Sequence, residues 1–308
     1  MTTRSSASGT SSAVEKTPPR WQADLALATV ALIWGVTFVV VKRALREIST
    51  VYFLAVRFGF ASLCLLLMFS GAFRKSDRSG ILRGLRGGAV AGVFLWLGYI
   101  LQTFGLKYTS AGNSGFLTGL YIVFVPVISA AVYRRFPQAR ELIGIVMATG
   151  GMVLLTIPSV KNEAGMNRGD LLTVGCAGAF ALHLLVLGYY SQRERFEAVA
   201  LGQIVCATGL SAISLFIEPP KATWTGQVVF AIVLTAVFAT AIAFALQTWG
   251  QQYTTPTRTA LIFALEPVFA YATAVSVGGE ALTVAGVCGG ALILTGILAV
   301  ELKPARGA

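Results

Sequence analysis

The sequence predicts an all-α integral membrane protein in which ten transmembrane helices form two inverted repeats of five helices each. Three observations lead to this fold class: a shortage of charge, a series of apolar runs, and an internal repeat. Of the 308 residues, 56% are hydrophobic and 12% are charged, and the mean hydropathy is +0.74. Soluble domains carry about 25% charged residues. A water-exposed surface over most of the molecule is therefore excluded.

The apolar runs define the expected helices. Each approaches the roughly 20 apolar residues that a helix needs to cross a bilayer. Turn-forming residues mark the gaps between several of them, including Gly71, Pro137 and Pro219-Pro220. The expected spans are 24–41, 50–70, 86–106, 112–132, 140–157, 170–190, 198–217, 227–248, 257–277 and 281–300.

Both chain ends lie outside these spans and are expected to be cytoplasmic tails. Residues 1–23 are rich in Ser and Thr and cannot bury enough apolar surface to fold, so a disordered segment is predicted. The first apolar run does not have the pattern of a signal peptide, because positive residues flank it on both sides and no small-residue cleavage site follows. Residues 301–308 form the second tail.

The positive charges predict the orientation of the chain in the membrane. Of the 24 Lys and Arg residues, sixteen fall on the side of the two termini, seven fall on the opposite side, and Arg57 falls within a span. Cytoplasmic loops carry the excess of positive charge, which predicts a multi-pass protein of the plasma (inner) membrane with both termini in the cytoplasm. Lys42, Arg43 and Arg46 form the one cluster that argues the other way. The net charge of +11 is thus a topology signal and does not indicate nucleic-acid binding.

The internal repeat carries the inference from fold to function. The octet Gln102–Thr109 recurs as Gln247–Thr254, a displacement of 145 residues, so that the chain divides into repeats over 24–157 and 170–300. Each repeat holds five spans, an odd number, and the second therefore enters the membrane from the side opposite to the first. Inverted repeats are characteristic of secondary transporters, in which substrate binds near the midplane between the halves and is exposed alternately to each side.

Short motifs at both ends of the repeats resemble a known family. Trp34-Gly35-Val36-Thr37-Phe38, followed by Arg57-Phe58, resembles the opening signature of an EamA-type repeat, and Leu265-Glu266-Pro267-Val268 resembles its close. Residues 24–300 are similar to two EamA repeats of the drug/metabolite transporter superfamily. The resemblance implies a ten-helix exporter with a central cavity lined by the first four helices of each repeat. Similar members include the YddG-type aromatic amino-acid exporters. Phe180-Ala181 replaces Trp-Gly in the second repeat.

Three ionisable residues within the spans are candidates for function, because charge inside a membrane is costly. Glu266 precedes a proline in the ninth span and is expected either to contact a substrate amine or carry a coupling proton, or else to serve as a structural carboxylate. Arg57 is expected to hold a substrate carboxylate, to reach the interface or to pair with another helix. His183, the single histidine, suits cavity lining, proton coupling or a bond to a neighbouring carbonyl.

Polar and aromatic residues within the spans complete the candidate substrate site. Aromatic side chains suit a bulky apolar solute, although a lipid-facing or interfacial anchoring role is favoured for any single one. The two glutamines are equivalent in the repeat and are expected near the pseudo-axis. Thr37 is expected to face the same way as His183. The candidates are Trp34, Thr37, Trp96, Tyr99, Gln102, Tyr121, His183, Gln247, Glu266 and Tyr271.

The sequence favours a secondary transporter that exports small organic metabolites, with aromatic or hydrophobic amino acids preferred. Proton antiport of drugs or other metabolites is the alternative. No G-x-x-x-x-G-K-[ST] motif indicates an ATP motor, and the chain lacks the clustered His, Asp or Glu that a membrane enzyme needs. No cofactor, metal or nucleic acid is expected. The expected partners are the lipid bilayer and a small-molecule substrate, and a monomer is compatible with this function.

Overall fold

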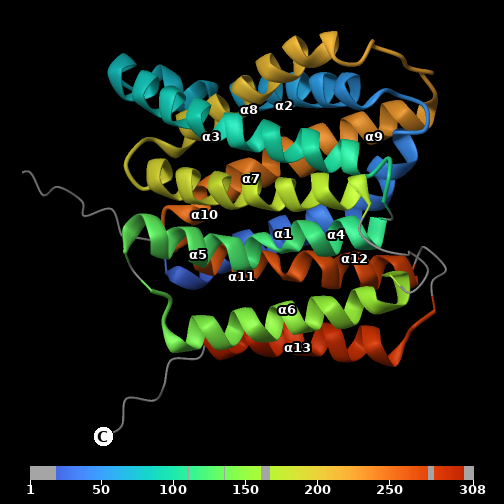
Figure 1. The fold of residues 1–308 in the computed structure, drawn as a ribbon. Coiled ribbons are helices and arrows are strands. Elements are labelled where there is room, and N and C mark those ends of the chain that lie inside the picture. The colour runs from blue at the N-terminus through green and yellow to red at the C-terminus, as the bar shows by residue number, and fades with distance from the viewer. Residues whose placement is uncertain (1–18, 110, 135, 161–166, 277–280, 302–308) are drawn as a thin grey trace, which may run out of the picture.

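A computed structural model of the chain describes residues 19–109, 111–134, 136–160, 167–276 and 281–301 (Figure 1). The described residues are helical apart from short connections, and they form ten helices when pieces separated by at most one residue are counted together. Seven of the helices are long and apolar enough to cross a membrane by length and composition. The predicted class, an all-α membrane protein of ten helices in two halves, is confirmed.

The first half contains five of these helices. They are α1 (Arg20–Ala44), α2 (Thr50–Arg74), α3 (Arg78–Gly105), a discontinuous helix made of α4 (Ala111–Gly119) and α5 (Tyr121–Tyr133), and α6 (Ala139–Val160).

The second half repeats the pattern. Its helices are α7 (Arg168–Ser191), α8 (Phe196–Ile213) with the 3₁₀ turn η1 (Ser214–Phe216), α9 (Gly226–Ala236) with the π-helical segment η2 (Val237–Ile242) and α10 (Ala243–Gln251), the discontinuous pair α11 (Pro256–Phe263) and α12 (Leu265–Ser276), and α13 (Val284–Glu301).

Two helices begin earlier than the sequence predicts. Helix α1 begins at Arg20, so residues 20–23 are helical and do not belong to a tail, while residues 1–18 lie outside the described part of the chain. Helix α3 begins at Arg78, eight residues before the expected start. Its first turns carry arginines on an exposed face, and glycines such as Gly84 lie on the buried face. The average hydropathy of residues 78–85 is therefore too low to predict that they belong to the span over 86–106.

The two halves interleave as an inverted repeat requires. Helix α3 of the first half packs against α7 and α8 of the second, and its equivalent α9–α10 packs against α1 and α2. Helices α6 and α13, the last of each half, lie side by side at one edge of the bundle, and α2, α3 and α8 lie toward the opposite edge (Figure 1). The middle of the bundle is therefore built from both halves.

Glycines allow the closest of these helix crossings. A Cβ on Gly202 of α8 would lie 2.5 Å from the carbonyl oxygen of Leu85 in α3. At the crossing of α6 with α13, a Cβ on Gly151 would lie 2.5 Å from the carbonyl oxygen of Gly289, and the reverse distance is 2.6 Å. Small residues at such points let two backbones touch, which is how helices associate in membranes.

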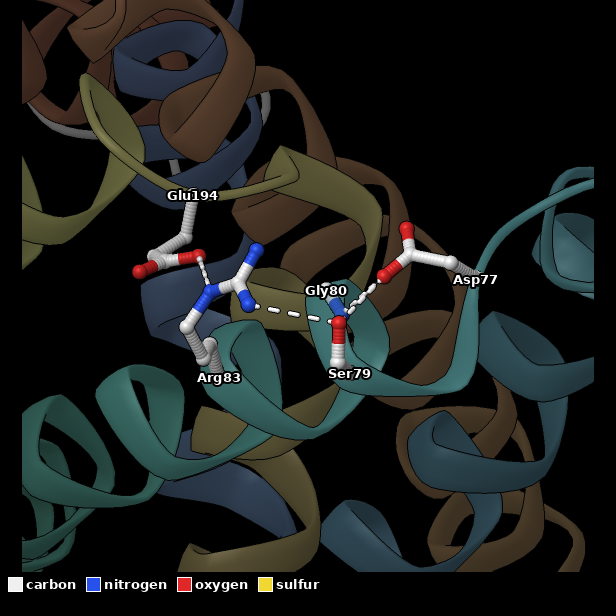
Figure 2. A network of polar contacts seen from close by, with 5 residues as sticks. All are labelled: Asp77, Ser79, Gly80, Arg83 and Glu194. Atoms are coloured by element: carbon white, nitrogen blue, oxygen red, sulfur yellow. Dashed lines mark hydrogen bonds and ion pairs between the residues drawn. The ribbon is translucent and has the colours of Figure 1, made fainter.

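A polar network fixes the start of α3 (Figure 2). The Asp77 carboxylate caps the helix, because it accepts hydrogen bonds from the Ser79 hydroxyl at 2.5 Å and from the Gly80 amide at 2.7 Å. Arg83 donates to the Ser79 hydroxyl at 3.3 Å and forms an ion pair of 3.3 Å with Glu194, which lies in the connection between α7 and α8. The network thus joins the capped end of α3 to the second half.

The cap predicts a small pH dependence of stability. Hydrogen bonds from Ser79 and Gly80 hold the pKa of the Asp77 carboxyl below its ordinary value. A group with a lowered folded pKa stabilises the fold above its unfolded pKa, and the contribution is lost as the pH falls through the folded value, below about pH 4. We expect Asp77→Asn, which keeps a capping acceptor, to flatten this dependence, and Asp77→Ala to lower the melting temperature at neutral pH by no more than about 1–2 °C.

The measurement is the melting temperature of wild type, Asp77→Asn and Asp77→Ala in detergent between pH 3 and pH 7. At each pH, the melting temperature of Asp77→Asn is subtracted from that of wild type. The contributions of other acidic groups cancel in this difference. A difference that does not change with pH over this range contradicts the role assigned to the carboxylate.

Candidate functional site: the central cavity

A cavity lies between the two halves. Its lining comes from α1, α2, α3 and the α4–α5 helix of the first half and from α7, α10 and the α11–α12 helix of the second, which are seven of the eight helices that the resemblance implies. Its volume is about 80 Å³. Since roughly 10–15 Å³ is enough to hold one water molecule, the cavity has room for several waters. A larger solute requires the surrounding side chains or helices to move.

The cavity brings together most of the residues expected from the sequence. Two expected residues lie outside the lining. Trp96 lies beside the face of α3 that lines the cavity, which carries Leu95, Tyr99 and Gln102. Its indole nitrogen is buried and has no hydrogen-bond partner in the described residues. The Tyr271 hydroxyl accepts a hydrogen bond from the Thr283 amide at 2.8 Å and thereby joins α12 to the start of α13. The expected residues in the lining are Trp34, Thr37, Arg57, Tyr99, Gln102, Tyr121, His183, Gln247 and Glu266.

Arg57 is the cation of the cavity. Its side chain is buried, with 4% exposure, and does not reach the interface. The guanidinium donates to the Thr240 hydroxyl at 2.8 Å, and to the Tyr99 hydroxyl and the Ala239 carbonyl oxygen, both at 3.3 Å. It also lies 4.9 Å from the centre of the Tyr99 ring. No carboxylate of the described residues forms an ion pair with it. Neutral groups therefore anchor the positive charge, and no ion pair among the described residues neutralises it.

The π-helical segment η2 provides this anchor. A π-helix leaves backbone carbonyls without their usual intrahelical donors and often marks functional sites. Here the Ala239 carbonyl oxygen accepts from both Arg57 and the Trp34 indole, the latter at 2.9 Å. The Thr240 hydroxyl donates to the Thr235 carbonyl oxygen at 2.9 Å, which leaves its own oxygen to accept from Arg57. One irregular segment of the second half thus positions two side chains of the first.

Glu266 supplies the carboxyl group of the cavity. It lies in the first turn of α12, directly after the break at Ala264 that divides the α11–α12 helix. A helix N-terminus favours negative charge. Helix α1 approaches closely here, because a Cβ on Gly35 would lie 2.7 Å from the Glu266 carbonyl oxygen. No hydrogen bond or ion pair joins the Glu266 carboxylate to the described residues, so it is available to a solute.

The repeat-equivalent pairs have different partners. The Thr37 hydroxyl donates to the Ile33 carbonyl oxygen at 2.8 Å, whereas its equivalent His183 bonds to Gln203 of α8 at 2.8 Å. Both have side chains in the lining. The Gln102 amide donates to the Thr118 hydroxyl at 3.1 Å. Its equivalent Gln247 is 1% exposed, and its amide oxygen has no partner among the described residues. The polarity of the cavity is therefore asymmetric.

Aromatic rings form the rest of the wall. The Trp34 ring lies 5.5 Å from that of Phe244 and 5.0 Å from that of Phe263, and Tyr99 lies 5.5 Å from Phe180, all between ring centres. Tilted and edge-to-face contacts of this kind are favourable. The rings give the cavity an apolar surface around its few polar groups.

The sequence reasoning missed several lining residues. Phe180 stands at the position of Trp34 in the second repeat, and Phe244 lies on the same helical face as Gln247. Thr240 extends that face by one further turn and holds Arg57. The spacing of Thr240, Phe244 and Gln247, four and three residues apart, was the signal that identifies this face.

The two ends of the cavity differ. Its lining reaches Leu106, directly after the end of α3, but at the other end it stops near Leu184, seven residues or about 10 Å before the end of α7. The buried apolar side chains of Leu27, Leu184 and Leu261 pack at that end. An ion pair there joins the two halves, because both oxygens of the Asp24 carboxylate accept from Arg258, at 2.7 and 3.1 Å. The Gln192 amide also donates to the backbone carbonyl oxygens of Gln251, the last residue of α10, and of Thr254 in the connection between α10 and α11.

A helical membrane protein with interleaved halves, and with a cavity between them that holds a few polar groups in an apolar wall, has the architecture of a transporter. The comparisons with known proteins agree. Residues 21–157 and 167–302 each match the EamA-like transporter family. This chain therefore belongs to the EamA-like transporter family, and its class is membrane transporter and not enzyme. The matched segments lie close to the repeats over 24–157 and 170–300 expected from the sequence.

Related proteins extend over nearly the whole chain. An uncharacterized transporter of Archaeoglobus fulgidus is 37% identical over 284 residues, which cover 92% of this chain and 87% of that protein. The uncharacterized transporter YoaV of Bacillus subtilis is 22% identical over 281 residues, which cover 89% and 94%. A solved crystal structure superposes with a TM-score of 0.74 over 91% of this chain and 96% of that one, at 19% identity. At this identity the likeness shows the fold alone.

Proposed function

We propose that this transporter exports small zwitterionic metabolites by alternating access, and that amino acids with aromatic or hydrophobic side chains are its preferred solutes. The observation that carries the proposal is that a guanidinium group and a carboxyl group line the same cavity. Arg57 and Glu266 both line it, and neither forms an ion pair within the described part of the chain. Arginine suits a carboxylate, and a carboxylate suits an ammonium group.

The wall between these charges supports an apolar side chain on the solute. Trp34, Tyr99, Phe180, Phe244 and Phe263 supply rings that bury apolar surface. Ligand sites commonly combine such walls with a few placed polar groups. A free amino acid has both charges and one apolar side chain, which is the combination that this cavity complements.

The direction and orientation of transport are part of the same proposal. Export follows from the resemblance of the repeats to those of YddG-type exporters. With both termini in the cytoplasm of a cell with this protein in its plasma (inner) membrane, as the loop charges predict, the end of the bundle that holds the Asp24–Arg258 ion pair faces the cytoplasm. In this orientation the lining at Leu106 lies toward the outer side.

The test is transport by proteoliposomes of the purified protein. We expect counterflow of labelled L-phenylalanine well above that of empty liposomes, and transport at least about tenfold slower for phenethylamine and 3-phenylpropionate, each of which keeps one charge. A missed charge–charge hydrogen bond costs about 1.5–3 kcal/mol, which corresponds to that factor or more. Equal transport of all three compounds contradicts recognition of both charges, and no transport of any tested amino acid contradicts the proposed solute class.

Proton antiport of drugs or other metabolites is the second candidate, and the unpaired Glu266 carboxylate favours it. A carboxylate that faces a cavity without a fixed cationic partner suits the binding and release of a coupling proton. In that case an imposed pH gradient drives transport, and Glu266→Gln abolishes this dependence. In a facilitator the gradient has no effect.

A further inference from the structure

We infer that the cavity contains a second recognition element, a pair of hydrogen-bond acceptors formed by His183 Nδ1 and Gln247 Oε1. These atoms select solutes that carry an uncharged N–H group on their apolar part. The inference rests on the proposed function, because it takes the central cavity as the solute site. The acceptor pair is proposed to bind the side chain of the solute, whereas Arg57 and Glu266 are proposed to bind its charged groups.

A relay of three hydrogen bonds fixes the first acceptor. It begins at the Phe244 carbonyl oxygen, which can only accept, so the Thr248 hydroxyl donates to it at 2.6 Å. The Thr248 oxygen then accepts from the Gln203 amide nitrogen at 3.0 Å, which turns the Gln203 oxygen toward His183. That oxygen is 2.8 Å from His183 Nε2, which must therefore be the protonated nitrogen. In a neutral imidazole the other nitrogen, Nδ1, carries a lone pair.

A second relay fixes the second acceptor in the same way. The Leu184 carbonyl oxygen accepts from the Gln251 amide nitrogen at 3.1 Å, which turns the Gln251 oxygen toward Gln247. That oxygen accepts from the Gln247 amide nitrogen at 3.4 Å. The Gln247 oxygen is then the end of the relay, and it is buried without a partner among the described residues. Both relays thus start at a backbone carbonyl and end at an acceptor.

The surroundings of the two acceptors determine what they bind. His183 and Gln247 are 2% and 1% exposed and both line the cavity. The His183 ring lies 6.0 Å from that of Phe244, in an apolar part of the wall. No ion pair in the described residues involves either side chain. Two neutral acceptors in an apolar wall suit a neutral donor, because a donor group buried without an acceptor loses its hydrogen bonds to water.

The relays also assign roles to residues outside the lining. Gln203 of α8 is absent from the lining, is 0% exposed, and determines which nitrogen of His183 carries the proton. Gln203 is thus a positioning residue, and it explains how α8 acts on the cavity without lining it. By the repeat displacement of 145 residues, Gln251 corresponds to Leu106, so the second relay is particular to the second half.

The experiment compares the dissociation constants of L-tryptophan and 1-methyl-L-tryptophan by calorimetry with the purified protein. The two compounds differ by replacement of one N–H with N–CH3. We expect wild type to bind tryptophan at least tenfold more tightly. The variants His183→Phe and Gln247→Met are expected to bring the ratio toward one by weakening tryptophan alone, and Gln203→Leu is expected to reduce the ratio without a change in 1-methyl-L-tryptophan binding. Thr208→Val removes a partly buried polar contact of α8 with Ser62 and should leave the ratio as in wild type.

Each outcome separates the two proposals. Equal binding of the two compounds by wild type, or a ratio that survives in the double variant His183→Phe/Gln247→Met, overturns the acceptor pair and leaves the proposed function in place. If wild type distinguishes the two compounds only by the size of the methyl group, the ratio of their dissociation constants survives in the double variant, and the acceptor pair is likewise overturned. If neither L-tryptophan nor L-phenylalanine binds, the proposed solute class fails and the inference fails with it.

Discussion

Glu266→Gln is expected to reduce transport of amino acids by about tenfold to a hundredfold while the protein keeps its melting temperature. The neutral amide removes the charge that meets a solute ammonium group, and hydrogen bonds to charged groups contribute about 1.5–3 kcal/mol. Stability should not fall, because the carboxylate has no hydrogen bond or ion pair to lose among the described residues. The measurements are initial rates in proteoliposomes and thermal unfolding in detergent.

A matched control exists on the surface of α8. Glu197 pairs with Arg195 at 3.4 Å, and the Arg195 side chain is 40% exposed, so Glu197→Gln changes the same functional group where an ion pair contributes little. Transport by Glu197→Gln should equal that of wild type. Unchanged rates in Glu266→Gln would remove this carboxylate from both solute binding and proton coupling.

Gly202→Ala is expected to lower the melting temperature by several degrees. A Cβ at this position would lie 2.5 Å from the carbonyl oxygen of Leu85 and 2.9 Å from its Cα, so α3 and α8 must separate. Overpacking of this kind costs about 1–3 kcal/mol. Backbone atoms form the contact, and no side-chain rotation relieves it.

Gly209→Ala provides the control in the same helix. No atom lies within 4 Å of a Cβ at Gly209, and Gly209 is exposed. Alanine is the better helix former, so the melting temperature should stay the same or rise slightly. Equal melting temperatures for the two variants would show that the crossing of α3 and α8 tolerates a wider separation.

Hydropathy and the repeat were sufficient to predict the fold because both act on long stretches of sequence. They failed where charge and apolar surface occupy opposite faces of one helix, as in the first turns of α3. The π-helical segment at Ala239 and Thr240 was also beyond prediction, since its residues are ordinary for a membrane helix and its geometry depends on Arg57 and Trp34 from the other half.

The candidate site was predictable to the extent that residues share a helical face. Tyr99 and Gln102 lie on one such face, and both line the cavity. Trp96 was expected beside them, although it is on the flank of that face. The hydrogen-bond relays behind His183 and Gln247 join α7, α8 and α10, and contacts between distant helices leave no periodic signal in a single sequence.

In the proposed alternating-access cycle, the ion pair between Asp24 and Arg258 favours the state in which it is formed. Its partners come from different halves, and both side chains are 21% exposed. In an alternating-access cycle this contact breaks and forms again in every turnover. A partly exposed pair contributes only about 1 kcal/mol, whereas a shift from 1:99 to 99:1 takes about 5.5 kcal/mol. Under the proposed mechanism, we therefore expect the contact to favour one state by an amount that solute binding can reverse.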